Sequence, residues 1–285
     1  MIASGEPRLL ALDLDGTVLG PDGDVPPRTR VAIERLRAGG VHVVLASGRV
    51  PTGMLRLCQE LGLDDYQITM QGALIVSPLT GSVLAAWRLE PAEARAHIAF
   101  AREAGAVPLL CFEEGFRSEI LVPEITALFA PFDEPLPLIV PDLDLLAAER
   151  PIKTFLYTPP GTHERIWAEA LEAFAGRATV TSGDEHSVEL LPLGASKGEA
   201  LRTLAAHLGI PLAEVAAIGD ARNDIAMLRL AGRSAAMAQA RPEVREAADL
   251  VVPSNSEEGA LQALEWFYPS LALLAAAAEP VAREI

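Results

Sequence analysis

Two aspartates separated by a single residue, Asp13 and Asp15, follow an apolar run at residues 9–12. An apolar run that ends in turn residues is typical of a buried strand, and open parallel sheets place their chemistry at the carboxyl ends of such strands. Side chains two apart on a strand share a face, so we expect both carboxylates to reach one site. Carboxylates this close repel each other, and a hard cation such as Mg²⁺ would compensate their charge.

A second acidic segment follows another apolar run, at residues 215–218, and precedes a helical pattern at 225–228. It contains Asp220, Asn223 and Asp224. A second strand is therefore expected to end in carboxylates, some two hundred residues after the first. The two strand ends can meet only if the sheet brings them together.

Two further segments carry what a phosphoryl group needs around it. Ser47 and Gly48 follow the apolar run at 41–45 and offer a hydroxyl and a backbone N–H, and Lys197 offers an ammonium. Lys153 and Lys197 are the only lysines in the sequence, and the other 21 of its 23 lysine and arginine residues are arginine. A lysine in this position is therefore less expected by chance.

In this order and spacing, the D-x-D-G-T, S-G-R, S-K-G and G-D-x-x-N-D segments resemble the signatures of the haloacid dehalogenase superfamily of phosphohydrolases. They are most similar to its Cof-type branch, which carries a large C2-type cap between the second and third motifs. The resemblance covers most of the chain. It implies a Rossmann-like core and a Mg²⁺-dependent phosphatase reaction through an aspartyl-phosphate.

The resemblance also implies roles for the acidic residues. Asp13 would be the nucleophile that attacks phosphorus, with a plain ion ligand as the alternative. Asp15 would be the general acid and base, and its backbone carbonyl would bind Mg²⁺. Asp220 would be the third ligand, so the expected metal set is Asp13, Asp15 and Asp220.

The remaining motif residues are assigned to the phosphate and its surroundings. Lys197 would neutralise the phosphoryl charge. Asp224 would support Lys197 or a metal-bound water, and Thr17 could bind phosphate. Asn223 and Asp224 could instead cap the helix that follows them, and Thr17 could cap its own segment. The expected phosphate ligands are Ser47, Gly48, Lys197 and Asn223.

The chain departs from the family pattern at Gln71 and Gln239, where relatives usually carry asparagine. Each change lengthens the amide side chain by one methylene. The substrate contacts that relatives make at these turns are therefore not assigned to this chain. Arg49, after Ser47 and Gly48, is expected in an exposed ion pair. Lys153 and the segment 184–186 lie in the expected cap, where they could face substrate or form a cap strand and a surface turn.

Strand and helix patterns alternate over residues 8–76 and again over 192–265, which favours a parallel, doubly wound α/β sheet. Between them, helical patterns such as 91–104 and 162–175 alternate with short strands, as in an α+β domain. The expected organisation is therefore a core of residues 1–83 and 189–285 with an inserted cap at 84–188.

Composition limits the partners of the protein. The 285 residues carry a net charge of −16, whereas nucleic acids and anionic membranes are bound by basic surfaces. No apolar run approaches the ~18 residues of a membrane span, and the stretch 271–278 is too short. The expected partner is a small phosphorylated metabolite, in the cytoplasm, with an oligomeric state that the sequence does not reveal.

Three other functions share parts of this pattern. A phosphomutase or phosphotransferase on the same scaffold would pass the phosphoryl group to another hydroxyl. A phospho-accepting signalling domain also groups acidic residues and a lysine around Mg²⁺, but it needs neither Asp15 nor a large insertion. A silent binding protein would not need the whole motif set. A phosphatase of small metabolites, such as sugar phosphates, is the leading expectation.

Overall fold

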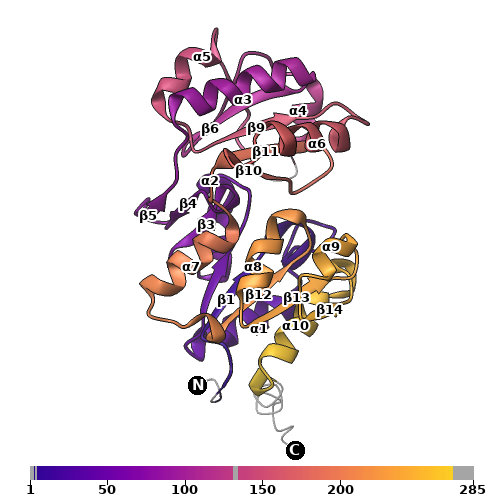
Figure 1. Ribbon diagram of the computed structural model, residues 1–285. Coiled ribbons are helices and arrows are strands. Elements are labelled where there is room, and N and C mark those ends of the chain that lie inside the picture. Colours follow the sequence, from indigo (N-terminus) through magenta and orange to yellow (C-terminus); the bar gives the residue numbers. More distant parts are fainter. Residues whose placement is uncertain (1–2, 4, 131–133, 272–285) are drawn as a thin grey trace, which may run out of the picture.

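The computed structural model describes residues 3, 5–130 and 134–271. Its two parts are a core with a parallel sheet and, above the carboxyl ends of that sheet, a cap with a sheet of its own (Figure 1). The alanine-rich stretch 275–278 noted in the sequence lies outside the described residues.

The core sheet is parallel and runs in the order β14-β13-β12-β1-β2. β1 lies in its interior and is buried throughout. Its alternate side chains serve opposite faces: Leu10 and Leu12 pack into one hydrophobic cluster, and Leu9 and Ala11 into another. The strands are β1 Leu9–Leu12, β2 His42–Leu45, β12 Val215–Gly219, β13 Arg233–Met237 and β14 Leu250–Val252.

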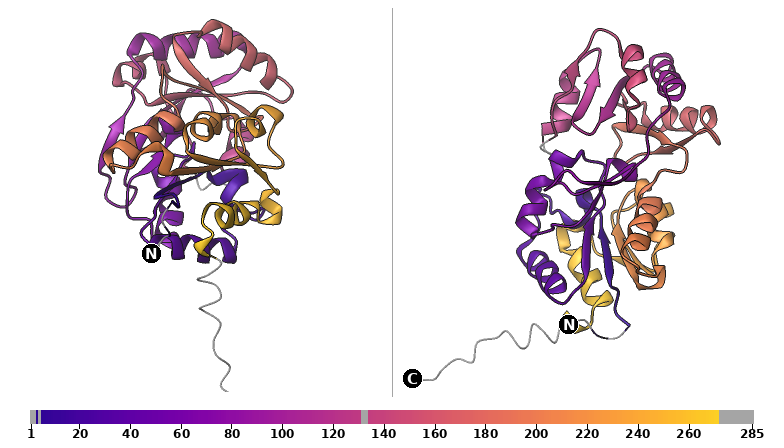
Figure 2. Two further views of the ribbon diagram at one scale, coloured as in Figure 1. Left: turned by 60° about the horizontal axis from the view of Figure 1, so that its bottom comes forward. Right: turned by 90° about the vertical axis from the view of Figure 1, so that its left-hand side faces the viewer.

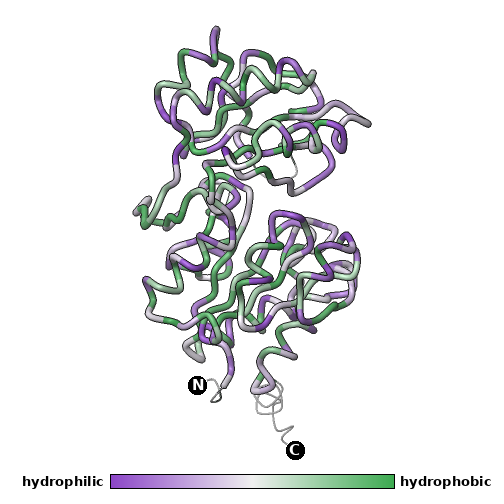
Figure 3. Tube along the Cα trace, viewed as in Figure 1, coloured by the Kyte–Doolittle hydropathy of each residue, from purple (hydrophilic) through white to green (hydrophobic). Residues whose placement is uncertain are grey.

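Helices cover both faces of this sheet, as the right-hand view of Figure 2 shows. One face carries α1 Pro27–Ala38, α2 Pro51–Leu61 and α10 Gly259–Phe267, and the other carries α7 Lys197–His207, α8 Ile225–Leu230 and α9 Pro242–Arg245. The apolar residues gather in the strands between these layers (Figure 3). This arrangement is the doubly wound core expected from the sequence.

A small antiparallel sheet, in the order β3-β4-β5, leads from the core to the cap. Its strands are β3 Gln67–Thr69, β4 Leu74–Val76 and β5 Val83–Ala86. The return to the core follows β11 Ser187–Pro192, which pairs with cap strands. The expected cap boundaries at 84 and 188 therefore fall inside strands, and we place the two crossings at 87–90 and 193–196 instead.

The cap sheet runs in the order β10-β11-β9-β6-β7-β8. The outer helices α3 and α6 pack on one face, and the other face turns toward the core. On that inner face, Phe116 and Phe155 share a hydrophobic cluster with core residues Val50, Met70 and Leu74. The cap elements are α3 Pro91–Ala104, β6 Val107–Phe112, β7 Gly115–Ser118, α4 Pro123–Phe129, β8 Leu138–Ile139, α5 Leu143–Leu146, β9 Lys153–Tyr157, α6 His163–Ala173, β10 Ala178–Thr181 and β11.

No helix in the described part of the chain is both long and apolar enough to span a bilayer.

One sequence expectation, the placement of Asp13 and Asp15 on one strand, is wrong in detail. β1 ends at Leu12, and the chain then turns tightly over Leu14–Val18. Asp13 and Asp15 therefore do not lie on one strand, although the backbone N–H of Asp13 still donates to the carbonyl of Ile218 in β12.

Candidate active site

The motif residues meet at the carboxyl edge of the core sheet. β1 and β12 are adjacent parallel strands, so Asp13 and Asp220, which follow them, lie side by side. Ser47 follows β2, the other neighbour of β1, after one intervening residue. Lys197 is the first residue of α7, whose N-cap Ser196 accepts a hydrogen bond from the N–H of Glu199. The adjacent strands and the first turn of α7 thus bring together residues that are far apart in the sequence.

Lys197 binds two carboxylates at the centre of the site. Its Nζ donates to Asp13 Oδ1 at 2.5 Å and to Asp224 Oδ1 at 2.7 Å, with the lysine side chain fully buried. Burial disfavours the ammonium, but the two carboxylates outweigh it and raise the pKa of Lys197 above its usual value. Lys197 is therefore a fixed positive charge beside Asp13.

Asp224 is fully engaged within the protein. Its Oδ1 accepts from Lys197, and its Oδ2 accepts from the backbone N–H groups of Asp220 and Ala221, each at 2.9 Å. This pattern fixes both the lysine and the loop that presents Asp220. Both oxygens of Asp224 are thus used in contacts that hold Lys197 and this loop.

An excess of buried negative charge surrounds Lys197. Carboxylate oxygens of Asp13, Asp220 and Asp224 lie within 4.8 Å of one another. Burial and the charge of Asp224 raise the pKa of Asp13 well above its usual range and that of Asp220 to about 7. Three carboxylates facing one ammonium fit a divalent cation, which carries the missing positive charge and prefers oxygen ligands.

The turn after Asp13 approaches Asp220 closely. Gly16 has φ +81°, and a Cβ there would lie 2.4 Å from Asp220 Oδ2, so glycine is required. Thr17 Oγ1 donates to Asp220 Oδ1 at 3.2 Å, and Gln239 Nε2 donates to the Gly16 carbonyl at 2.6 Å. Thr17 and Gln239 therefore stabilise the loops that carry Asp13 and Asp220.

Asp15 is held by Arg49, to which the sequence assigned no part in the site. Arg49 donates to both of its carboxylate oxygens, at 2.5 and 3.1 Å. The sequence predicted an exposed ion pair for Arg49, but the side chain is 8% exposed. The only sequence signal for this contact was the position of Arg49 directly after Ser47 and Gly48.

Ser47 and Gly48 form a tight turn beside Asp15. Ser47 Oγ accepts from the N–H of Arg49 at 3.2 Å. A Cβ on Gly48 would lie 2.4 Å from Gln71 Nε2, so a larger residue here would push the Gln71 amide away. Both residues line the same cavity as Asp13 and Asp15, consistent with their expected place around a phosphoryl group.

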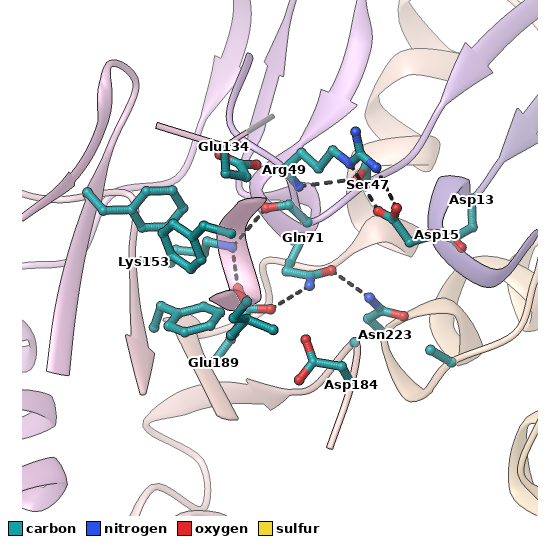
Figure 4. Close-up of a pocket in the computed structure, with 17 residues that line it drawn as sticks. Asp13, Asp15, Ser47, Arg49, Gln71, Glu134, Lys153, Asp184, Glu189 and Asn223 are labelled. Carbon is teal, nitrogen blue, oxygen red and sulfur yellow. Dashed lines mark hydrogen bonds and ion pairs between the residues drawn. The ribbon is translucent and has the colours of Figure 1, made fainter. Parts of the chain in front are cut away.

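Asn223, an expected phosphate ligand, contacts Gln71 at the edge of the cavity. Its Nδ2 already donates to Gln71 Oε1 at 2.8 Å, and its Oδ1 is buried without a hydrogen-bond partner among the described residues. Gln71 in turn donates from Nε2 to Glu189 Oε1 at 2.5 Å. The extra methylene of Gln71 thus lets it bridge the core to the cap (Figure 4).

The cap contributes charged residues that the sequence left open or missed. Lys153 is buried, pairs with Glu189, and donates to the Gly48 carbonyl at 3.0 Å. Glu134 Oε1 accepts from the N–H of Val50 at 2.9 Å. Lysine scarcity could have identified Lys153, whereas nothing in the sequence distinguished Glu134 or Glu189 from other glutamates.

These groups enclose a cavity of about 130 Å³ between core and cap. Asp13, Asp15 and Ser47 lie at its core end, and Phe116, Phe129 and Phe155 line its cap end. Asp184 also lines the cavity, so one residue of the 184–186 segment does face it, as Figure 4 shows.

Comparisons with known proteins agree with this geometry. A family model described as haloacid dehalogenase-like hydrolase matches residues 10–264. Phosphatase YwpJ of Bacillus subtilis is 32% identical over 282 residues, covering 88% of this chain and 96% of that protein. The HMP-PP phosphatase of Cronobacter sakazakii is 31% identical over 237 residues, covering 83% of this chain and 86% of that protein.

Solved structures show the same architecture. The subclass IIB sugar phosphatase BT4131 superposes with a TM-score of 0.81 at 25% sequence identity, covering 91% of this chain and 98% of that one. A haloacid dehalogenase-like hydrolase from B. subtilis gives a TM-score of 0.80 at 25% identity, with coverages of 90% and 99%. The match extends over core and cap together.

Proposed function

The chain belongs to the haloacid dehalogenase-like hydrolase family, and from that premise we propose that it is a Mg²⁺-dependent phosphomonoesterase acting through an aspartyl-phosphate on Asp13. The observation that carries the proposal is the arrangement around Asp13. Lys197 holds one of its oxygens, and Asp15 lines the same cavity two residues further on. A nucleophile, a fixed cation and an acid thus share one enclosed site.

The first half-reaction transfers the phosphoryl group to the protein. An Asp13 oxygen attacks phosphorus, the bond from phosphorus to the ester oxygen breaks, and Asp15 gives its proton to the departing alkoxide. Lys197 offsets the charge on the phosphoryl oxygens, while Ser47 and Gly48 bind them. Arg49 orients Asp15 from the other side.

The second half-reaction restores the enzyme. Asp15, now ionised, takes a proton from water as the water oxygen attacks phosphorus. The bond between Asp13 and phosphorus breaks, which releases inorganic phosphate and the free Asp13 carboxylate. Asp15 ends the cycle protonated, as it began.

Asp13, Asp220 and the backbone carbonyl of Asp15 would hold Mg²⁺, which supplies positive charge against the repulsion between Asp13 and the incoming phosphate. The support for this assignment is the excess of buried carboxylates over cations. Asp224 is not included, because both of its oxygens are used within the protein.

We propose a small phosphorylated metabolite as substrate and the cytoplasm as the place of action. The similar protein BT4131 is described as a sugar phosphatase, so sugar phosphates are the first class to test. A phosphomutase or phosphotransferase remains the alternative on this scaffold. A phospho-accepting signalling domain is disfavoured by the paired Asp15 and by the cap.

The test is phosphate release from a panel of phosphorylated metabolites, with Mg²⁺ and with a chelator. We expect inorganic phosphate from at least one ester with Mg²⁺ and none after thorough chelation. An isomerised ester without free phosphate would indicate a mutase. Undiminished release without divalent ions would contradict the metal assignment.

A further inference from the structure

The cap end of the active-site cavity must accommodate the organic part of any substrate. With the phosphoryl group at Asp13, the remainder of an ester extends toward Phe116, Phe129 and Phe155. These rings pack edge-on or tilted against one another with centroids 4.7 to 6.2 Å apart, and they form an apolar wall. The charged side chains that line the cavity beside these rings therefore determine which esters fit.

The cations near this wall are already engaged by carboxylates. Lys153 is paired with Glu189 and also binds the Gly48 carbonyl. Arg49 is bound to both oxygens of Asp15. A second anionic group on a substrate would have to displace Glu189 from Lys153 or Asp15 from Arg49, which is unfavourable.

Two residues that line the cavity, Glu134 and Asn223, each carry an oxygen without a hydrogen-bond partner among the described residues. These atoms, Glu134 Oε2 and Asn223 Oδ1, are both buried. Burial raises the pKa of Glu134 to about 7, because neither Lys153 nor Arg49 fully compensates its charge. Asp184 adds a further carboxylate to the lining. Buried acceptors without partners indicate a ligand that brings donors.

We propose that the cap selects phosphate esters whose organic part carries a positively charged nitrogen, with Glu134 as its counter-ion, and rejects esters that carry a second anionic group. The inference rests on the proposed phosphatase activity and adds a substrate class to it. Glu189 does not serve as the counter-ion, because Lys153 and Gln71 already occupy both of its oxygens.

The test uses three phenyl phosphates of similar shape, which suit the phenylalanine wall. They carry a 4-aminomethyl, a 4-hydroxymethyl or a 4-carboxymethyl group and so differ in charge. Phosphate release is measured with Mg²⁺ for the full-length wild type. We expect kcat/KM to fall from the amine to the alcohol to the acid, with the amine favoured over the acid by roughly 10-fold to 100-fold.

The matched variant is Glu134→Gln, which keeps an oxygen to accept from Val50 N–H and removes only the charge. We expect the ratio of amine to acid kcat/KM to collapse toward one. Glu172→Gln, an exposed change on α6 far from the cavity, is the control and should retain the wild-type ratio. Comparing ratios cancels the small differences among the three leaving groups.

The outcomes separate this inference from the function beneath it. If neither the three esters nor any member of the metabolite panel released phosphate, both the phosphatase function and the charge selection would be overturned. Release without a preference for the amine, or a preference that survives Glu134→Gln, would overturn the charge selection alone. If the variant does not fold, the wild-type ranking still decides.

Discussion

Arg49 holds the carboxylate of Asp15 with two hydrogen bonds, from Nη2 to Oδ1 at 2.5 Å and from Nε to Oδ2 at 3.1 Å. The guanidinium is buried and follows Ser47 and Gly48 in the second motif. A residue of the second motif therefore fixes the carboxylate that the first motif supplies. With Asp15 as the proposed acid, we infer that Arg49 positions it for proton transfer.

Arg49→Ala should slow alkyl phosphates more than aryl phosphates. Without the guanidinium, Asp15 loses its fixed orientation, and an alkyl leaving group depends on its proton. We expect kcat to fall about 10-fold to 100-fold for an alkyl ester and clearly less for 4-nitrophenyl phosphate. Arg28→Ala, an exposed residue paired with Glu258, is the control. Equal losses on both esters would argue against the positioning role.

Asp13→Asn should abolish turnover while the fold is retained. The amide is nearly isosteric and keeps an oxygen for Lys197, but it is a poor nucleophile. We expect at least about a 10³-fold loss in kcat, with an unchanged circular dichroism spectrum. Asp22→Asn, an exposed change, serves as the comparison. A variant that kept more than about a tenth of the wild-type rate would have lost less than ~1.4 kcal/mol, too little for removal of the nucleophile.

Asp15→Asn should trap the phosphorylated protein when the leaving group is good. Such a leaving group needs little protonation, whereas activation of water still needs a base. We expect acid-quenched Asp15→Asn to carry label from a ³²P-labelled aryl phosphate, and Asp13→Asn to carry none. If Asp15→Asn never becomes labelled, its assigned role is wrong.

The stability of the metal-free protein should depend on Asp220 with a defined sign. Burial and Asp224 raise the pKa of Asp220 from an ordinary 3.8 to about 7. Between these two pH values the folded state binds more protons than the unfolded state, so the contribution of Asp220 to stability decreases as pH rises. Relative to wild type, Asp220→Asn should therefore gain melting temperature between about pH 5 and about pH 8 in a chelator.

Mg²⁺ should reverse this trend, because it binds the ionised carboxylate. Its addition should raise the melting temperature of wild type more near pH 8 than near pH 5, and that of Asp220→Asn much less. Thermal unfolding followed by circular dichroism measures both effects. A difference between the two proteins that did not vary with pH would contradict the assigned pKa shift.

The buried pair of Lys153 and Glu189 should show strong coupling. Lys153→Met leaves the Glu189 carboxylate buried with Gln71 as its one remaining side-chain partner among the described residues, at a cost of about 3–5 kcal/mol. Adding Glu189→Leu removes that uncompensated charge, so the double variant should recover much of the loss. Urea unfolding of the four proteins in the cycle measures the coupling energy. Additive effects would show that the pair does not act as a unit.

Local patterns were sufficient to predict the core and which residues meet at its edge. The apolar runs before Asp13 and Asp220 favour buried strands, and parallel strands present their carboxyl ends at one edge. The structure places Lys197 against Asp13, because a lysine at the start of a helix can reach a neighbouring strand tip. Motif order and strand polarity therefore sufficed to predict that these residues lie together, although the sequence placed Asp15 on the strand instead of in the turn that follows.

The cap side of the site was decided only by tertiary structure. Gln71 and Glu189 lie 118 positions apart, and the bond between them depends on how the cap docks on the core. The Asn223 amide nitrogen donates to Gln71, and the Asn223 carbonyl oxygen has no partner among the described residues. Such contacts depend on packing between domains, which local periodicity does not encode. The sequence therefore predicted which residues meet at the carboxyl edge of the core sheet, and the docking of the cap decided which groups line the rest of the cavity.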